Sequence, residues 1–158
     1  MVRMPSFPTT YFGELEYTSD SVFEFPSGIP GFEKHTRFLL VEQAQSHPLV
    51  FVQSLLSPEL CFIAVPVRVV DPQYRLELSE EDLTSMEFPN SAQPRIGEDV
   101  ACLALVTVTE NADPTANLRS PLVLNLKRKV GFQIIHQDFG YSFRQPIQSC
   151  EEAAQCSC

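Results

Sequence analysis

The sequence contains no tryptophan, only six glycines and no apolar run long enough to span a bilayer. Thirteen prolines against those six glycines predict many short elements separated by turns rather than long helices. Without tryptophan, the core of this 158-residue chain is expected to consist of its twelve phenylalanines and of branched aliphatic side chains. Residues 1–10 lack the apolar segment typical of a secretory signal, which predicts a cytoplasmic protein with no membrane partner.

Basic side chains are also scarce, since 11 Lys and Arg stand against 20 Asp and Glu, a net charge of −9. An acidic surface repels a phosphate backbone, so direct nucleic-acid binding is not expected. The same charge favours encounter with basic protein partners. It would equally serve solubility alone.

The five cysteines form an odd set without a secretory signal, which does not indicate a disulfide framework. Cys61 and Cys102 lie inside apolar runs and are expected to be buried and unreactive. The other three crowd the C-terminus as Cys150, Cys156 and Cys158. We expect residues 148–158 to form a flexible tail after a single domain over residues 1–147. The tail thiols lack a fourth ligand for a closed metal site, so no metal or cofactor is predicted, and a redox- or metal-responsive adaptor is kept as an alternative.

Short apolar or alternating segments of strand length recur along the chain. The strongest is 100–109, which is rich in β-branched residues, whereas 110–116 is expected to be a loop. Residues 121–126 and 131–136 are expected to pair as a hairpin. The other predicted strands are 11–17, 22–25, 37–41, 49–53, 60–65, 67–70 and, last, 138–144.

One helix is predicted, over residues 78–86, with Ser79 as its N-cap. Leu78 and Leu83 are spaced as a hydrophobic staple. Carboxylates fill the first turn, where they meet the positive end of the helix dipole: Glu80, Glu81 and Asp82. Together these elements predict an all-β fold in the main, an antiparallel β-barrel-like domain with one short helix, and a sandwich as the alternative arrangement.

Catalytic apparatus is not evident in the sequence. A nucleophile needs an adjacent base, and the histidines share no spacing with Cys61 or Cys102. There is no glycine-rich phosphate loop. We therefore predict a binding protein rather than an enzyme, with a small-ligand-binding barrel as an alternative.

The most unusual segment is the loop that follows the strand at 22–25. It contains two prolines and two glycines, which force a stiff turn, and it still carries the apolar residues Ile29 and Phe32. Either these side chains fold back into the core as a structural corner, or the loop is a preorganised binding edge. We refer to residues 25–33 as the Pro–Gly loop.

The Pro–Gly loop reads FPSGIPGFE and resembles the F-P-x-G-I-P-G-F-E signature of the flagellar assembly factor FliW family. Further segments resemble that family in the same order, over roughly residues 11–147, and five ordered motifs are far more specific than one. These segments are Gln53-Ser54 with Pro58-Glu59-Leu60 and Phe62-Ile63, residues 78–83, residues 117–125 and residues 141–147. The cysteine-bearing tail departs from the family pattern.

The resemblance implies a compact, β-rich, non-enzymatic protein of the cytoplasm that binds flagellin. It also implies binding to the RNA-binding regulator CsrA, which relieves repression of flagellin translation. Free flagellin would take the protein away, release CsrA and lower flagellin synthesis. The candidate partner-binding residues are Phe25, Pro26, Ile29, Pro30, Phe32, Glu33, Glu80, Glu81, Asp82, Asn117 and Arg119.

Overall fold

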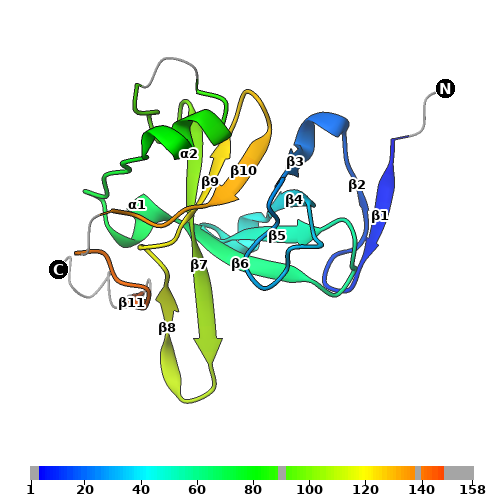
Figure 1. The fold of residues 1–158 in the computed structure, drawn as a ribbon. Coiled ribbons are helices and arrows are strands. Elements are labelled where there is room, and N and C mark those ends of the chain that lie inside the picture. The colour runs from blue at the N-terminus through cyan, green and yellow to red at the C-terminus, as the bar shows by residue number, and fades with distance from the viewer. Residues whose placement is uncertain (1–3, 89–91, 138–139, 148–158) are drawn as a thin grey trace.

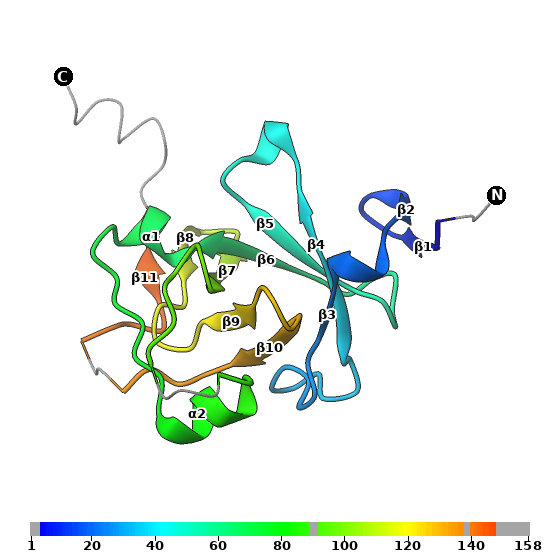
Figure 2. The same cartoon turned by 90° about the horizontal axis from the view of Figure 1, so that it is seen from above.

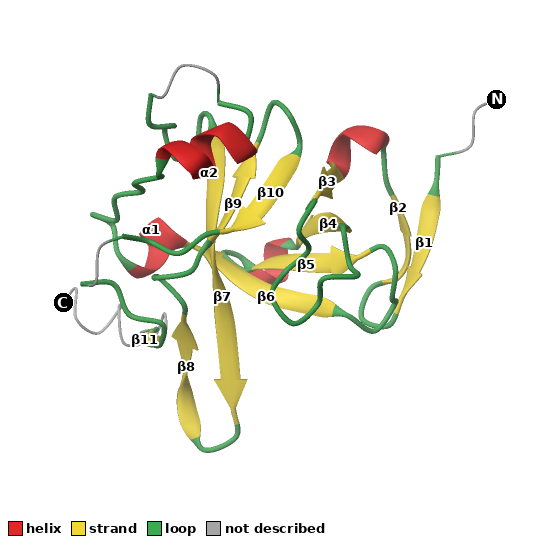
Figure 3. Ribbon diagram, in the orientation of Figure 1, coloured by secondary structure: helices red, strands yellow, loops and turns green. Residues whose placement is uncertain are grey.

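The computed structural model describes residues 4–88, 92–137 and 140–147. Seven strands close into a barrel in the order β3–β4–β5–β6–β7–β9–β10, and β10 pairs back onto β3 (Figures 1 and 3). Their bounds are Val22–Glu24 (β3), Arg37–Glu42 (β4), Val50–Ser54 (β5), Cys61–Pro66 (β6), Val100–Thr109 (β7), Leu122–Asn125 (β9) and Val130–Gln133 (β10). The prediction of a mainly β, barrel-like fold is confirmed, as are the β9–β10 hairpin and the long strand β7.

The barrel closes through one parallel pair, β10 with β3, at the register Val130 opposite Glu24. All other neighbours in the barrel are antiparallel. An odd number of strands cannot alternate in direction all the way round a closed barrel, so one parallel pair is unavoidable. The fold is therefore a mixed barrel rather than a purely antiparallel one.

Strand β7 holds three neighbours together because it is long enough to pair with a different strand along each part of its length. Val100 to Leu103 pair with β9, Leu103 to Leu105 pair with β6, and its far end pairs with β8 (Ala112–Ala116). Figure 1 shows the β7–β8 ribbon projecting away from the barrel. The β-branched residues of β7 suit a strand that pairs with neighbours on both sides.

Two predicted segments differ in the structure. The expected loop over 110–116 is wrong in its second part, which forms β8, and Pro114 lies where the β7–β8 register shifts, a place that tolerates a residue without an N–H. The expected strand over 67–70 is instead a one-turn helix, α1 (Val67–Val70), since the chain turns at Pro66 to bury Val67.

The chain ends supply three further strands. The last short strand is β11 (Gln145–Pro146), which pairs with β8, so its expected place at 138–144 is wrong for the residues described there. Strand β1 (Ser6–Thr9) was not predicted, and it pairs with β2 (Gly13–Glu16) in a separate two-stranded sheet. The predicted tail, residues 148–158, lies outside the described residues, so its flexibility stays a prediction.

Helix α2 (Glu80–Ser85) confirms the predicted helix and its start. The Asp82 N–H donates to Oγ of Ser79 at 3.1 Å, as expected of an N-cap. Leu78 and Leu83 are both buried in the same cluster, in agreement with the predicted staple. With α1 the described chain has two α-helices rather than one, besides the 3-10 turns Ser19–Ser21 and Ala44–Ser46.

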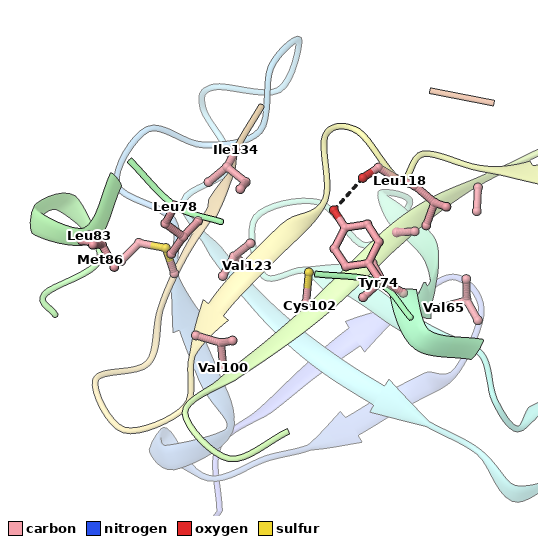
Figure 4. Close-up of a cluster of buried hydrophobic side chains, with 13 residues drawn as sticks. Val65, Tyr74, Leu78, Leu83, Met86, Val100, Cys102, Leu118, Val123 and Ile134 are labelled. Carbon is pink, nitrogen blue, oxygen red and sulfur yellow. Dashed lines mark hydrogen bonds between the residues drawn. The ribbon is translucent and has the colours of Figure 1, made fainter. Parts of the chain in front are cut away.

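The core consists of two clusters on opposite faces of the same strands, because side chains alternate along β7. One cluster lies on the outer face of β6, β7 and β9, beneath the helices, and includes Cys102, Ala104 and Tyr74, whose hydroxyl donates to the Leu118 carbonyl at 2.6 Å (Figure 4). The other fills the inside of the barrel with Phe23, Phe25, Ile29, Phe38, Val50, Val52, Ala64, Leu103, Leu122 and Leu124. These apolar side chains occupy the inside of the barrel, where the small-ligand alternative would require a cavity.

Candidate partner-binding surface

The Pro–Gly loop is built from two consecutive tight turns. In the first, the Gly28 N–H donates to the Phe25 carbonyl at 2.8 Å. In the second, the Phe32 N–H donates to the Ile29 carbonyl at 2.6 Å. Proline at the second position and Gly31 with φ of 89° at the third are the residues that a type II turn demands. The local sequence therefore fixes the loop backbone.

Gly28 is required for a second reason besides its φ of 65°. A Cβ at this position would lie 2.6 Å from the Cα of Glu33, so the first turn packs directly against the backbone at the end of the loop. The Gly31 N–H donates to Oε1 of Glu33 at 2.9 Å and holds the pKa of that exposed carboxyl below its ordinary value. These contacts make the loop a closed, stiff unit.

The apolar side chains of the loop divide between the core and the surface. Phe25 and Ile29 are buried inside the barrel, and the ring of Phe25 meets that of Phe38 edge-on at 5.1 Å. Their assignment as partner contacts is corrected, because burial leaves no side-chain surface for a partner, and we assign them to anchoring the loop. Phe32, in contrast, is 39% exposed.

The exposed part of Phe32 borders a shallow hollow on the barrel rim. Beneath it, the ring rests edge-on against Phe62 at 5.1 Å between centroids. The hollow is lined by Phe32, His35, Ser57, Glu59 and Leu60. It combines two apolar side chains with one carboxylate, which suits an apolar side chain of a partner next to a basic one. We call these five residues the Phe32 hollow.

A serine fixes the far wall of the hollow. The Ser54 hydroxyl accepts the N–H groups of Leu56 and Ser57 at 3.0 and 3.2 Å. These bonds occupy both lone pairs of its oxygen, so its proton is available to Nδ1 of His35, 2.7 Å away. One buried side chain thus positions the turn after β5 and the imidazole across from it.

The remaining candidate residues lie elsewhere in the fold and are not brought together with the Phe32 hollow. Pro26, Pro30 and Glu33 are exposed on the loop itself. Glu80 and Glu81 are exposed on α2, whose Leu83 packs on the outer core cluster, and Asp82 is half-buried there.

Asn117 and Arg119 have structural roles. The Asn117 Oδ1 accepts the Ser120 N–H at 2.8 Å, which closes a local turn. The N–H of Arg119 donates to the Ser142 carbonyl, and its guanidinium lies over the ring of Phe143 at 5.1 Å. These contacts tie the segment after β8 to the C-terminal segment, and a partner contact at these two half-buried residues stays a prediction.

Sequence reasoning did not select His35, Ser57, Glu59 or Leu60 as contact residues. A signal was present for the last two, because they belong to the Pro58-Glu59-Leu60 motif. What was lacking was the information that this motif folds next to Phe32, since 27 to 28 positions separate them in the chain and the strands β4 to β6 bring them together.

The cysteines described in the structure do not form a reactive site. Burial raises the pKa of the half-buried Cys61 thiol to about 11 and that of the buried Cys102 thiol to about 12. Among residues 4–88, 92–137 and 140–147, no group of three His, Cys, Asp or Glu side chains is placed to hold a metal ion. Within the same ranges, none of the helices is both long and apolar enough to cross a bilayer.

Comparison with known proteins identifies the family. The FliW protein family model matches residues 6–147. The flagellar assembly factor FliW of Syntrophomonas wolfei is 33% identical over 140 residues, 88% of this chain and 86% of the relative. That of Bacillus licheniformis is 32% identical over 140 residues, 88% and 94% of the two chains, and that of Bacillus subtilis is 29% identical over 145 residues, 90% and 97%.

The likeness extends to three dimensions. A crystal structure of the flagellar assembly factor FliW superposes with a TM-score of 0.78 at 28% identity, and covers 92% of this chain and 98% of that one. The family model and the relatives cover most of the chain, including the Pro–Gly loop and the strands that surround it. The chain therefore belongs to the FliW family, whose members are non-enzymatic flagellar assembly factors.

Proposed function

We propose that this protein works in the cytoplasm as a partner switch between flagellin and a CsrA-type RNA-binding translational regulator. Bound to the regulator, it relieves repression of flagellin translation. When unassembled flagellin accumulates, flagellin takes the protein away, and the released regulator lowers further synthesis. The proposal needs two protein partners and no chemical step, which agrees with membership of a non-enzymatic family.

One observation carries the proposal at the level of residues. The loop that bears the family signature buries Phe25 and Ile29 but leaves Phe32 exposed beside a hollow. A large aromatic on a stiff backbone loses little conformational entropy when a partner docks. Aromatic side chains in such positions supply much of the binding energy of protein interfaces. We therefore propose the Phe32 hollow as a partner contact.

The charge of the chain supports the second partner. A protein that binds RNA presents basic side chains to the phosphate backbone. The net charge of −9 on this chain is complementary to such a partner. The exposed carboxylates of Glu80 and Glu81 at the start of α2 remain a prediction as contacts for it.

The test uses purified flagellin monomer and purified CsrA-type regulator, titrated separately and then in competition. Phe32→Ala is expected to weaken binding of at least one of them by about tenfold or more, since truncating a central aromatic costs over 1 kcal/mol. The matched control is Val108→Ala, an exposed apolar residue (64%) at the far end of β7 that should leave both affinities unchanged. A wild-type protein that binds neither partner would refute the proposal.

The dependence of affinity on ionic strength distinguishes charge-assisted binding of the regulator from apolar binding at the Phe32 hollow. Affinity for the regulator should fall between low and high salt, because exposed charge pairs are screened. Binding through the Phe32 hollow should depend less on salt, because burial of the Phe32 and Leu60 side chains is not an interaction between charges. An affinity for the regulator that does not change with salt would contradict the electrostatic argument and leave the Phe32 contact standing.

A further inference from the structure

The β1–β2 hairpin has one open edge that is suited to receive another strand. The Tyr17 N–H donates to the Pro5 carbonyl at 3.0 Å, in register with the pairs Phe7–Leu15 and Thr9–Gly13. In an antiparallel ladder, hydrogen-bonded and non-hydrogen-bonded pairs alternate. The intervening residues of β2, Glu14 and Glu16, therefore direct their backbone N–H and C=O groups away from β1.

The two edges of this hairpin are unequal. The edge of β1 includes Pro8, which has no N–H, and a proline is a usual way to blunt an edge strand. The edge of β2 keeps two N–H and two C=O groups, from Glu14 and Glu16. In the described part of the chain, β1 is the one strand that pairs with β2, and no backbone hydrogen bond from outside the hairpin reaches Glu14 or Glu16.

The open edge lies on the side of the hairpin that faces the barrel, as Figures 1 and 2 both show. The hairpin is held there by the Thr10 N–H, which donates to the Pro58 carbonyl at 3.0 Å, and by the Phe12 ring, 5.2 Å from that of Phe51. An apolar hollow lies at this junction. Its lining consists of Tyr11, Phe12, Phe51, Cys61 and Ile63.

We propose that the open edge of β2 binds an extended segment of a partner protein in which basic and apolar side chains alternate. The carboxylates of Glu14 and Glu16 are exposed on one face of β2, and Leu15 is half-buried on the other. Residues of an added strand share these two faces. Lysine or arginine then lies across from the two carboxylates, and the alternate side chains lie beside Leu15 and toward the apolar hollow.

A second copy of this chain is a poorer occupant than a basic partner. Pairing β2 with β2 across a two-fold axis would set Glu14 and Glu16 against the same two carboxylates. Like charges directly opposite in a sheet are destabilising, and each copy also carries a net charge of −9. Charge therefore selects a basic segment over self-association.

The experiment uses the acetylated and amidated hexapeptide Lys-Val-Lys-Val-Lys-Val, with Glu-Val-Glu-Val-Glu-Val as its matched control. Amide hydrogen exchange of the full chain is followed by NMR with and without each peptide. The Lys-Val peptide is expected to slow exchange at the amides of Glu14 and Glu16, with little change at Leu15, whose amide already faces β1. The Glu-Val peptide should bind at least about tenfold more weakly.

Two variants separate backbone pairing from charge. Glu16→Pro removes an outward N–H and leaves the hydrogen bonds to β1 in place. It is expected to lower the affinity for the Lys-Val peptide by about threefold to tenfold. Ser6→Pro removes an outward N–H at the register partner on β1, together with the hydrogen bond from Ser6 Oγ to Oε1 of Glu14, and should lower the affinity for the peptide less than Glu16→Pro does. The exposed double substitution E14K/E16K should reverse the preference toward the Glu-Val peptide.

Three results would overturn the inference. The first is exchange at Glu14 and Glu16 that the Lys-Val peptide does not slow. The second is a peptide preference that E14K/E16K leaves unchanged. The third is protection of the same amides without peptide at high protein concentration, which would assign the edge to a second copy of this chain.

Discussion

The Pro–Gly loop and the β1–β2 hairpin turn the chain through glycines of nearly the same φ, 65° at Gly28 and 66° at Gly13. The surroundings of the two turns differ. Gly28 is buried against the backbone of Glu33, whereas nothing lies within 4 Å of a Cβ at Gly13. The Phe25 side chain of the loop is fully buried inside the barrel, while that of Phe12 in the hairpin turn is half-buried. The same local conformation thus serves a rigid corner in one place and a lightly attached sheet in the other.

This difference has a functional consequence. A surface that must present one side chain in one position benefits from an anchored backbone, as at Phe32. An edge that must accept an incoming strand benefits from a sheet that is not already joined to its neighbours, as at β2. An isolated two-stranded hairpin is marginal in stability, so its attachment to the barrel is needed to keep it folded.

The largest expected effect comes from the anchoring aromatic. Phe25→Ala should lower the free energy of unfolding by about 3–5 kcal/mol, because it empties a fully buried site in the barrel. Phe12→Ala should cost about 1–2 kcal/mol, since part of that ring is already in water. Denaturant unfolding measures both values. Equal losses would show that the hairpin is as firmly anchored as the loop.

The two glycines come next. Gly28→Ala should destabilise the protein by at least about 3 kcal/mol, since a left-handed alanine adds strain and its Cβ meets the backbone of Glu33 at 2.6 Å. Gly13→Ala should cost about 1–2 kcal/mol from the left-handed conformation alone. Thermal and denaturant unfolding of the pair tests the comparison. A Gly28→Ala loss no larger than that of Gly13→Ala would contradict the close approach in the loop.

The smallest effect concerns the carboxyl that closes the loop. The Gly31 N–H lowers the pKa of Glu33 from its ordinary 4.5, so the ionised form is favoured in the folded state. The resulting support for the loop is present above pH 4.5 and is lost as the pH falls through the lowered pKa. An NMR titration should show the Glu33 carboxyl and the Gly31 amide titrating together below pH 4.5. Glu33→Gln should abolish the amide response.

Local signals in the sequence identified many of the elements, and each failure has a physical cause. The Ser79 cap with three following carboxylates located the start of α2, and the β-branched run located β7. Residues 67–70 also look like a strand, yet they form α1, because burial of Val67 after the turn at Pro66 outweighs β propensity. Strand β8 was missed because its Pro114 is tolerated only where the partner register shifts.

In the candidate site, too, local sequence signals identified some features, whereas others depend on tertiary contacts. The sequence selected the Pro–Gly loop and Phe32, because proline and glycine spacing encodes turns locally. It also selected Phe25 and Ile29, which resemble Phe32 in chemistry but are buried. It also selected Asn117 and Arg119, whose contacts with neighbouring segments depend on the tertiary structure and whose contact with a partner stays a prediction.

By itself, the sequence determined that this protein is mainly β, that it belongs with the FliW family, and that a stiff double turn bears the family signature. These properties follow from local backbone preference and from residue order along the chain. The tertiary structure decided that, of Phe25, Ile29 and Phe32, only Phe32 is exposed, that β10 closes the barrel on β3, and that β2 keeps an open edge. Burial and strand partners depend on segments distant in the chain, and local preference carries no information about those.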